Sequence, residues 1–182
     1  MATLTIEDVK EKIRAVPDFP KKGIIFRDIT TGLKDAETLQ VMVDYLCDQY
    51  KDCKIDYIAG IESRGFIFGM PMAYKLDCGF IPVRKPNKLP AETIKESYDL
   101  EYGSDSIEIH ADAIEKGANV VVVDDLLATG GTASAACSLV KKAGGNVDSA
   151  AFVIELTPLN GAEKIKQTTG VEVISMLKYD LD

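Results

Sequence analysis

Residues 120–132 combine the residue types that a phosphate and sugar site requires. Four valines lead into the carboxylates Asp124 and Asp125, and the turn that follows contains Gly130 and Gly131. Glycines let the backbone curl closely around a ligand and expose successive N–H groups, and a helix start adds the positive end of its dipole. The stretch therefore predicts a cradle for a phosphate monoester, with two acceptors beside it for the hydroxyls of a ribose.

Three further residues complete this turn. Thr129 and Thr132 offer hydroxyl donors, Ala128 is small, and a helix is expected to begin near Thr132. Other phosphate motifs fit poorly, because the sequence has no GxxxxGK[ST] and this turn does not give GxGxxG. The alternative is an ordinary glycine-rich turn capped by threonine, which gives no reason for two adjacent acids at the end of a buried strand.

The charge of the chain limits what it binds and how. It has 29 acidic and 21 basic residues and a net charge of −8. This argues against general nucleic-acid binding, which depends on neutralising phosphates with Lys and Arg. The same charge repels a small phosphorylated substrate at long range. A phosphate site must therefore be built locally, from backbone N–H groups, a few placed cations and a metal ion.

Length and composition indicate one cytoplasmic domain covering residues 1–182. A chain of 182 residues can bury a sizeable core without cross-links. Its four cysteines show neither a CxxC pair nor Cys/His metal spacing, so reduced thiols are expected. The N-terminus lacks the pattern of a secretory signal, and no apolar window approaches the roughly 20 residues that cross a bilayer, so no membrane association is expected.

Helical periodicity is clear in two segments near the N-terminus. Thr5 is expected to cap a helix that runs through Val16 and is ended by Pro17. Apolar residues that recur every 3.6 positions favour a second helix near residues 35–50.

Two later segments contain prolines. A helix is expected to follow the turn at residues 62–65 and to end at Leu76, with its regular part starting near Gly69 so that Pro71 lies in the first turn. The polar stretch from Lys85 to Tyr98 has no clear period, and we interpret it as a mobile loop.

The remaining pattern predicts an α/β fold. Strands alternate with helices, and β-branched runs are typical of strands buried on both faces of a parallel sheet. That order implies right-handed crossovers and a ligand site at the carboxyl ends of the strands. The expected strands are Ile55–Gly60, Phe80–Arg84, Ser106–His110 (half-exposed), Val120–Asp124, Val147–Glu155 and Val171–Met176, and the later helices are Thr132–Ala143 and Ala162–Lys166.

Residues 120–132 resemble the phosphoribosyl-pyrophosphate (PRPP) loop of type I phosphoribosyltransferases. Residues 17–29, 56–66, 96–103 and 155–161 extend the resemblance to the adenine phosphoribosyltransferases over about four fifths of the chain. The resemblance implies the type I fold, a mostly parallel central sheet flanked by helices. It also implies a small N-terminal hood at about residues 17–32 and a flexible loop at about residues 85–105.

The resemblance assigns the adenine site to the hood. The backbones of Ile25 and Arg27 would pair with the edge of the base and Phe26 would stack on one face, while Leu156 or Leu159 would close the other. An aromatic surface suits a flat apolar ring, and one donor and one acceptor suit its polar edge. Without the resemblance, Phe26 as an ordinary core residue remains open.

The resemblance assigns a group of polar residues to pyrophosphate, with Arg64 in a catalytic role. An arginine just beyond a strand end offers bidentate pairing with phosphate oxygens. Taken without the resemblance, the cations of this group would be interpreted as surface charges. The group is Glu62, Ser63, Arg64, Arg84, Lys85 and Lys88. Glu62 departs mildly from the family pattern, because other members carry Asp there.

Proton transfer is assigned to Glu101 on the same basis. The resemblance places this glutamate beside the imidazole ring of the base, with Tyr102 next to it in the substrate site. An isolated glutamate in a strand is ordinarily an exposed side chain, so the assignment depends on the resemblance. His110 is the only histidine, and its neighbours alternate as in a solvent-facing strand, so a catalytic role is not expected.

The expected function is purine salvage: PRPP and adenine give AMP and pyrophosphate. The resemblance implies that Mg²⁺ is bound with PRPP, with no protein ligand assigned, and that the protein is a homodimer. Two alternatives remain, a phosphoribosyltransferase for another base such as xanthine or orotate, and a non-catalytic PRPP-sensing regulator. The regulator would need a DNA-binding segment or a basic face, and the sequence has neither.

Overall fold

The computed structural model describes residues 4–99 and 104–180, and the chain forms two compact units, residues 1–45 and 46–182. The prediction of one domain stays a prediction, and each unit is described by itself. No helix within the described ranges is long and apolar enough to cross a membrane.

The first unit begins with a short capped helix, α1 (Ile6–Glu11). The Thr5 hydroxyl accepts the N–H of Asp8 at 3.2 Å, and the Asp8 carboxylate accepts the N–H of Thr5 at 2.7 Å, so the predicted cap is confirmed. The predicted extension of this helix to Val16 is wrong. Residues Arg14–Pro17 form strand β1 instead, because β-pairing with a partner strand outweighs the weak helical periodicity of this segment.

That partner is β2 (Ile25–Asp28), which pairs antiparallel with β1. A short helix, α2 (Thr30–Leu33), follows. The predicted second helix is confirmed as α3 (Ala36–Asp48), and the Asp35 carboxylate accepts the N–H of Thr38 in its first turn at 3.0 Å. The first unit thus consists of a β-hairpin and three helical segments, of which α3 continues into the second unit.

The second unit is built on a five-stranded sheet in which every neighbouring pair is parallel, in the order β4-β3-β7-β8-β9. The predicted α/β fold with a parallel sheet flanked by helices is confirmed. The strands are β3 (Tyr57–Ile61), β4 (Gly79–Val83), β7 (Asn119–Leu127), β8 (Asn146–Leu156) and β9 (Glu172–Tyr179).

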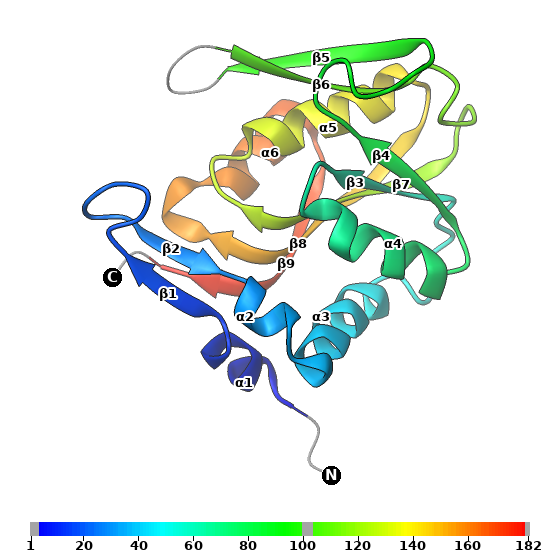
Figure 1. Ribbon diagram of the computed structural model, residues 1–182. Coiled ribbons are helices and arrows are strands. Elements are labelled where there is room, and N and C mark those ends of the chain that lie inside the picture. Colours follow the sequence, from blue (N-terminus) through cyan, green and yellow to red (C-terminus); the bar gives the residue numbers. More distant parts are fainter. Residues whose placement is uncertain (1–3, 100–103, 181–182) are drawn as a thin grey trace. The chain divides into compact units, whose positions relative to one another are not determined.

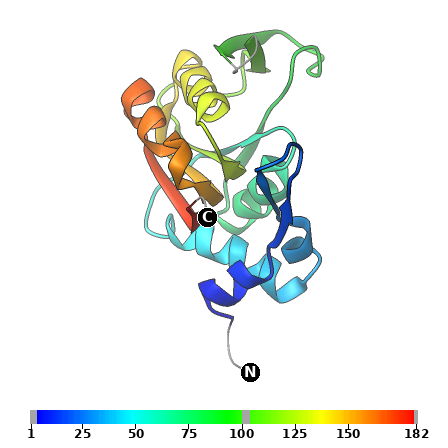
Figure 2. The same ribbon diagram turned by 90° about the vertical axis from the view of Figure 1, so that its left-hand side faces the viewer.

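Helices cover both faces of this sheet. The helix α4 (Gly65–Lys75) joins β3 to β4, whereas α5 (Gly131–Lys142) and α6 (Gly161–Thr169) follow β7 and β8. Because the chain moves in opposite directions from β3 and from β7, right-handed crossovers place α4 on one face and α5 with α6 on the other (Figures 1 and 2). The strand order therefore reverses between β3 and β7, and their carboxyl ends form the switch point where such sheets bind ligands.

Helix α4 differs from the prediction at its start. It begins at Gly65, so Pro71 lies in its interior and not in its first turn. Proline has no N–H to give to the residue four positions earlier. That residue is Ile67, on an exposed side of the helix, where water can satisfy the carbonyl group.

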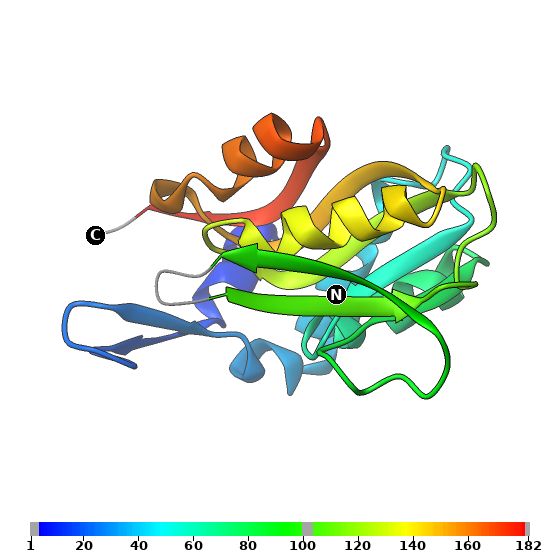
Figure 3. The ribbon, with the colours of Figure 1, turned by 90° about the horizontal axis from the view of Figure 1, so that it is seen from above.

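The predicted mobile loop contains a strand. Residues Thr93–Asp99 form β5, which pairs antiparallel with β6 (Ser104–His110), and this hairpin runs alongside α5 (Figure 3). β6 was expected to be half-exposed, yet all four residues from Ser106 to Ile109 are buried. The reason is that the hairpin packs on α5 and contributes Ile107 and Ile109 to the core.

Candidate active site

The predicted phosphate loop connects β7 to α5. Gly130, the N-cap residue of α5, has φ 78°, a left-handed conformation that favours glycine. Because glycine has no side chain, the N-cap residue gives the N–H groups in the first turn of α5 no side-chain hydrogen bond. The turn borders a cavity of about 110 Å³, and residues 126–133 line it together with Asp124 and Phe152. The structure thus gathers the predicted loop residues around one hollow at a helix N-terminus.

The two acids of the loop lie inside β7, which continues to Leu127 and does not end at Asp124 as predicted. Asp125 is only 2% exposed, and an oxygen of the Asp124 carboxylate accepts its N–H at 2.8 Å. Burial, with the adjacent Asp125 adding to it, raises the pKa of Asp124 well above its usual range. Burial also raises the pKa of Asp125, while the Arg64 guanidinium acts in the opposite direction. The fold therefore works against the ionised form of both carboxyl groups.

Arg64 pairs with Asp125 across the switch point. Its Nε lies 3.1 Å from a carboxylate oxygen of Asp125. Arg64 follows β3 and Asp125 lies near the carboxyl end of β7, and the two side chains can meet because β3 pairs directly with β7. Sequence analysis assigned both residues to PRPP separately, but it did not predict that they contact each other.

Two more of the predicted pyrophosphate residues form an ion pair. Arg84 donates from Nε to Glu62 at 2.9 Å, and the N–H of Lys85 donates to the same carboxylate at 2.8 Å. The hydrogen bond from Arg84 holds the pKa of Glu62 below its usual value. Glu62 therefore orients two cationic residues at the end of β4, and Ser63 lies exposed beside it at the end of β3.

Lys85 has partners that sequence analysis missed. Its Nζ donates to the Tyr98 hydroxyl at 2.9 Å and pairs with the Asp105 carboxylate, which places it between β5 and β6. Nothing in the sequence indicated Asp105, because the contact depends on the hairpin register that places Tyr98 opposite Asp105. Lys88 is exposed in the segment before β5.

The hood residues occupy β2 in the first unit. Phe26 is half-buried and pairs with Val16 of β1, and its ring lies edge-on to Phe19 with centroids 5.3 Å apart. Ile25 and Arg27 flank Phe26 on the strand. Phe26 is not fully buried, so this ring surface is not that of an ordinary core residue.

The predicted leucines lie near the start of α6. Leu156 ends β8 and is half-buried, and Leu159, 39% exposed, lies in the 3-10 turn η1 (Thr157–Leu159). Glu101 and Tyr102 lie outside the described residues. His110 ends β6, and its Nε2 is buried without a hydrogen-bond partner in the part of the chain that the structure describes.

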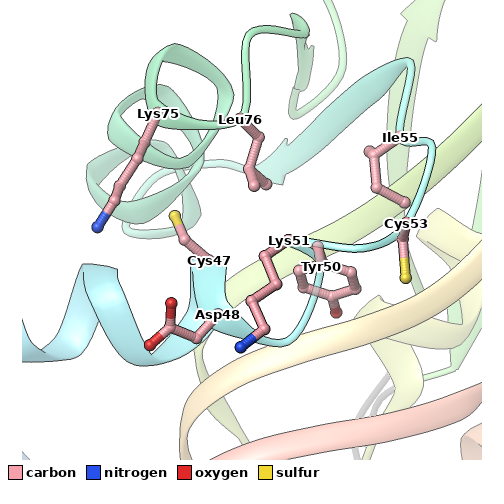
Figure 4. Close-up of a pocket in the computed structure, with 8 residues that line it drawn as sticks. All are labelled: Cys47, Asp48, Tyr50, Lys51, Cys53, Ile55, Lys75 and Leu76. Atoms are coloured by element: carbon pink, nitrogen blue, oxygen red, sulfur yellow. The ribbon is translucent and has the colours of Figure 1, made fainter.

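A cavity of about 290 Å³ lies at the other edge of the sheet (Figure 4). Its walls come from the end of α3, the end of α4 and the chain before β3, near the amino ends of the strands. It exposes the ammonium groups of Lys51 and Lys75 together with the Asp48 carboxylate. These mixed charges select no class of ligand. The catalytic candidates described above lie at the opposite end of the strands, the carboxyl end.

The fold and the site together define a phosphoribosyltransferase. Residues 34–175 match the family described as phosphoribosyl transferase domain. The chain is 56% identical to the adenine phosphoribosyltransferase of Clostridium perfringens over 173 residues. The aligned region covers 95% of this chain and 99% of that protein.

Solved structures agree with this match. The fold is similar to the adenine phosphoribosyltransferase of Thermoanaerobacter pseudethanolicus (TM-score 0.91, 53% identity, 96% of this chain and 100% of that one). It is also similar to the enzyme of Saccharomyces cerevisiae in complex with an imino-altritol bisphosphate and adenine (TM-score 0.87, 40% identity, 94% and 98%). The chain belongs to the adenine phosphoribosyltransferase family, a group of pentosyl-transferring glycosyltransferases. The family, fold class and enzyme class predicted from the sequence are therefore confirmed.

Proposed function

We propose that the protein transfers the 5-phosphoribosyl group of PRPP to adenine, giving AMP and pyrophosphate in purine salvage. The bond between C1′ and the pyrophosphate oxygen breaks, a bond from C1′ to N9 of adenine forms, and the proton of N9 is lost. The observation that carries this proposal is the continuous stretch from Asp124 to Thr132, in which two carboxylates lead directly to a helix N-terminus without a side-chain cap. This order matches a ligand that has a sugar diol and a terminal phosphate.

The 5′-phosphate would lie on the turn from Ala128 to Thr132. The N–H groups at the start of α5 and the hydroxyls of Thr129 and Thr132 would donate to it, and the helix dipole would favour its charge. The Asp124 and Asp125 carboxylates would accept hydrogen bonds from the ribose hydroxyls. Fixing both ends of the ribose phosphate in this way orients C1′ for attack.

The pyrophosphate would interact with Arg64, Arg84, Lys85 and Lys88. In the structure three of these cations are paired with carboxylates, Arg64 with Asp125, Arg84 with Glu62 and Lys85 with Asp105. Such pairs limit the positive charge of the site in a protein whose net charge is −8. Binding of pyrophosphate would then exchange or share these partners, and the cations would stabilise the charge that develops on the leaving group.

Adenine would bind to the hood through the backbones of Ile25 and Arg27 and the ring of Phe26, with Leu156 or Leu159 on its other face. Glu101 would accept or share the proton lost from the imidazole ring, with Tyr102 beside it. The structures of relatives support a base site of this kind, since one was solved with adenine and another, from Giardia lamblia, with 9-deazaadenine.

Mg²⁺ would bind together with PRPP, with no protein ligand assigned. Among the residues that the structure describes, no group of three or more His, Cys, Asp or Glu side chains could hold a metal ion. The pKa values of Asp124 and Asp125 are both raised by desolvation, and a carboxyl group that resists ionisation is a weaker ligand for Mg²⁺ than a free carboxylate, although it can still bind a hydroxyl group. When bound, Mg²⁺ would neutralise negative charge on PRPP.

We propose further that the protein is a cytoplasmic homodimer that binds neither nucleic acid nor membrane. An apolar stripe on α4, formed by Ile67, Met70 and Tyr74 at helical spacing, supports self-association, and Tyr74 is 90% exposed. Light scattering after chromatography should give twice the mass of one chain. If a Tyr74→Lys variant still has the mass of a dimer by light scattering, α4 does not form the dimer interface.

One assay tests the function. Pyrophosphate release is measured from PRPP and Mg²⁺ with adenine, hypoxanthine, guanine, xanthine or orotate as the acceptor. Release with adenine supports the proposal, and release with another base alone would support the alternative acceptor. PRPP binding without release with any base would support the regulator.

A further inference from the structure

Two glycines hold the phosphate loop directly against the start of α6. A Cβ atom added to Gly130 would lie 2.6 Å from the carbonyl oxygen of Gly161 and 3.1 Å from its Cα atom. A Cβ atom added to Gly161 would overlap the carbonyl oxygen of Ala128 and lie 2.9 Å from Cδ1 of Leu127. The two backbones thus approach more closely than any residue with a side chain permits.

The nearest obstacle to a side chain at Gly161 is a backbone atom, the carbonyl oxygen of Ala128, and the next two are side-chain atoms of Leu127. A flexible side-chain end could rotate away from a new methyl group, but the carbonyl group of Ala128 moves only with the loop itself. Both glycines are buried, and closely packed interiors tolerate an added methyl group poorly. A methyl group at Gly161 therefore has to displace the phosphate loop, the start of α6, or both.

The start of α6 is tied to the segment with the two leucines. Asn160, in a left-handed conformation with φ 52°, is both the last cap of η1 and the N-cap of α6. Its N–H donates to the carbonyl group of Thr157 at 3.1 Å, and its own carbonyl group accepts the N–H of Lys164 at 3.0 Å. A shift at Gly161 is therefore transmitted to Leu159, only two residues away.

We infer that Gly161 is a positioning residue that sets the spacing between the phosphate loop and the segment Leu156–Leu159. This inference rests on the proposed function, in which the loop holds the phosphate of PRPP and the leucines cover the base. Attack on C1′ requires both substrates in register, and a displacement of about 1 Å is sufficient to lower a rate by about 10²-fold. Gly161 touches neither substrate and acts only through the contact with Gly130, Ala128 and Leu127.

The first test compares two alanine variants at opposite ends of α6. In Gly161→Ala the turnover rate or the efficiency with PRPP should fall by about 10- to 100-fold in protein that remains folded. Gly170→Ala is the control at the other end of the same helix, because no atom lies within 4 Å of a Cβ added to Gly170, although its φ of 73° strains an alanine. It should lose stability through backbone strain and keep KM and kcat within about twofold. Rates are corrected for the folded fraction of each variant.

The outcomes separate the inference from the function on which it rests. Wild-type protein that forms no AMP from PRPP and adenine refutes the proposed function. Active wild type with a folded Gly161→Ala variant of normal kcat and KM for both substrates overturns the positioning role and leaves the function intact. A loss that is equal in both glycine variants also overturns it, because the loss would then not depend on the contact between Gly161 and the phosphate loop.

A second measurement on the wild type does not depend on the folding of any variant. PRPP with Mg²⁺ and without adenine should slow hydrogen exchange at amides 157–164, because fixing the loop fixes the segment packed on it. Amides 166–169, at the far end of α6, should exchange at their previous rate. Unchanged exchange at residues 157–164 when PRPP is bound overturns the inference, and failure of PRPP to slow exchange at residues 129–134 would instead refute the placement of the phosphate.

Discussion

Replacing Asp124 by asparagine should stabilise the protein and weaken its affinity for PRPP. Burial and the adjacent Asp125 raise the pKa of Asp124 in the folded protein above its ordinary value of 3.8. As pH rises from 3.8 through the raised folded pKa, the unfolded chain loses its proton first, so the wild type becomes less stable over that window. Asparagine cannot ionise, and it keeps an oxygen that can accept the N–H of Asp125. In the present protein that N–H lies 2.8 Å from Oδ1 of Asp124.

The stability gain should be of the size found when a functional site gives up an unfavourable group, about 0.5–2 kcal/mol. For a domain of this size about 1 kcal/mol raises Tm by about 2–4 °C. The gain should be present above the folded pKa of Asp124 and largely absent near pH 3.5, where the folded protein and most of the unfolded chain hold the proton. Calorimetry at pH 3.5 and pH 8 measures both values.

The functional loss comes from the ribose. A hydrogen bond to a carboxylate contributes about 1.5–3 kcal/mol, which corresponds to about a 10- to 150-fold weaker affinity for PRPP by titration calorimetry. Asp112→Asn is the control, because Asp112 is exposed and should change neither quantity. A lower Tm of Asp124→Asn at pH 8, or an equal gain at both pH values, would refute the account of the buried charge. Unchanged PRPP affinity would refute the assignment of Asp124 to the ribose.

Four further outcomes are expected. Glu101→Gln should lower kcat by about 10² to 10⁴, with PRPP affinity within a few fold, and a near-normal rate would remove its role in proton transfer. Gly131→Val should abolish PRPP binding in a folded protein, because a side chain there crowds the phosphate, and unchanged affinity by calorimetry would mean that the phosphate lies elsewhere. EDTA should stop the reaction and Mg²⁺ restore it, without a change in the Tm of the free protein; tight Mg²⁺ binding to the free protein would contradict this. Hypoxanthine and guanine should have a kcat/KM about 10²- to 10⁴-fold below that of adenine, because a backbone donor of the hood would face a donor and a backbone acceptor would face an acceptor. Comparable efficiency with hypoxanthine would refute the assignment of the base site to Ile25 and Arg27.

Most of the parallel sheet could be predicted from the sequence. The valine run before Asp124 is apolar on both faces, as a strand between two helical layers must be, and it forms the centre of β7. The phosphate loop was predicted as well, because all its residues are consecutive and its conformation depends on local chemistry. Gly130, with its left-handed backbone at the start of α5, is the clearest instance.

Predictions failed where distant segments decide the local structure. Residues 14–16 were expected to be helical, but they belong to strand β1, which exists only because residues Ile25–Asp28 pair with it. Strand β5 was expected to be a loop for the same reason, since its polar residues acquire order through pairing with β6. Burial of Glu108 in β6 also has no local signal, because it follows from the packing of the hairpin on α5.

The site shows the same division between local and distant information. The sequence indicated Arg64 and Asp125 separately, each at the end of a strand. Their contact requires β3 and β7 to be neighbours, although a helix, a strand and a hairpin lie between these two strands in the chain. The approach of Gly161 to Gly130 likewise requires α6 to begin against the loop after β7, although all of β8 lies between them. Chemistry that lies within one stretch can therefore be predicted from residue types, whereas the spacing between two such stretches depends on strand order and on the absence of a side chain at the contact.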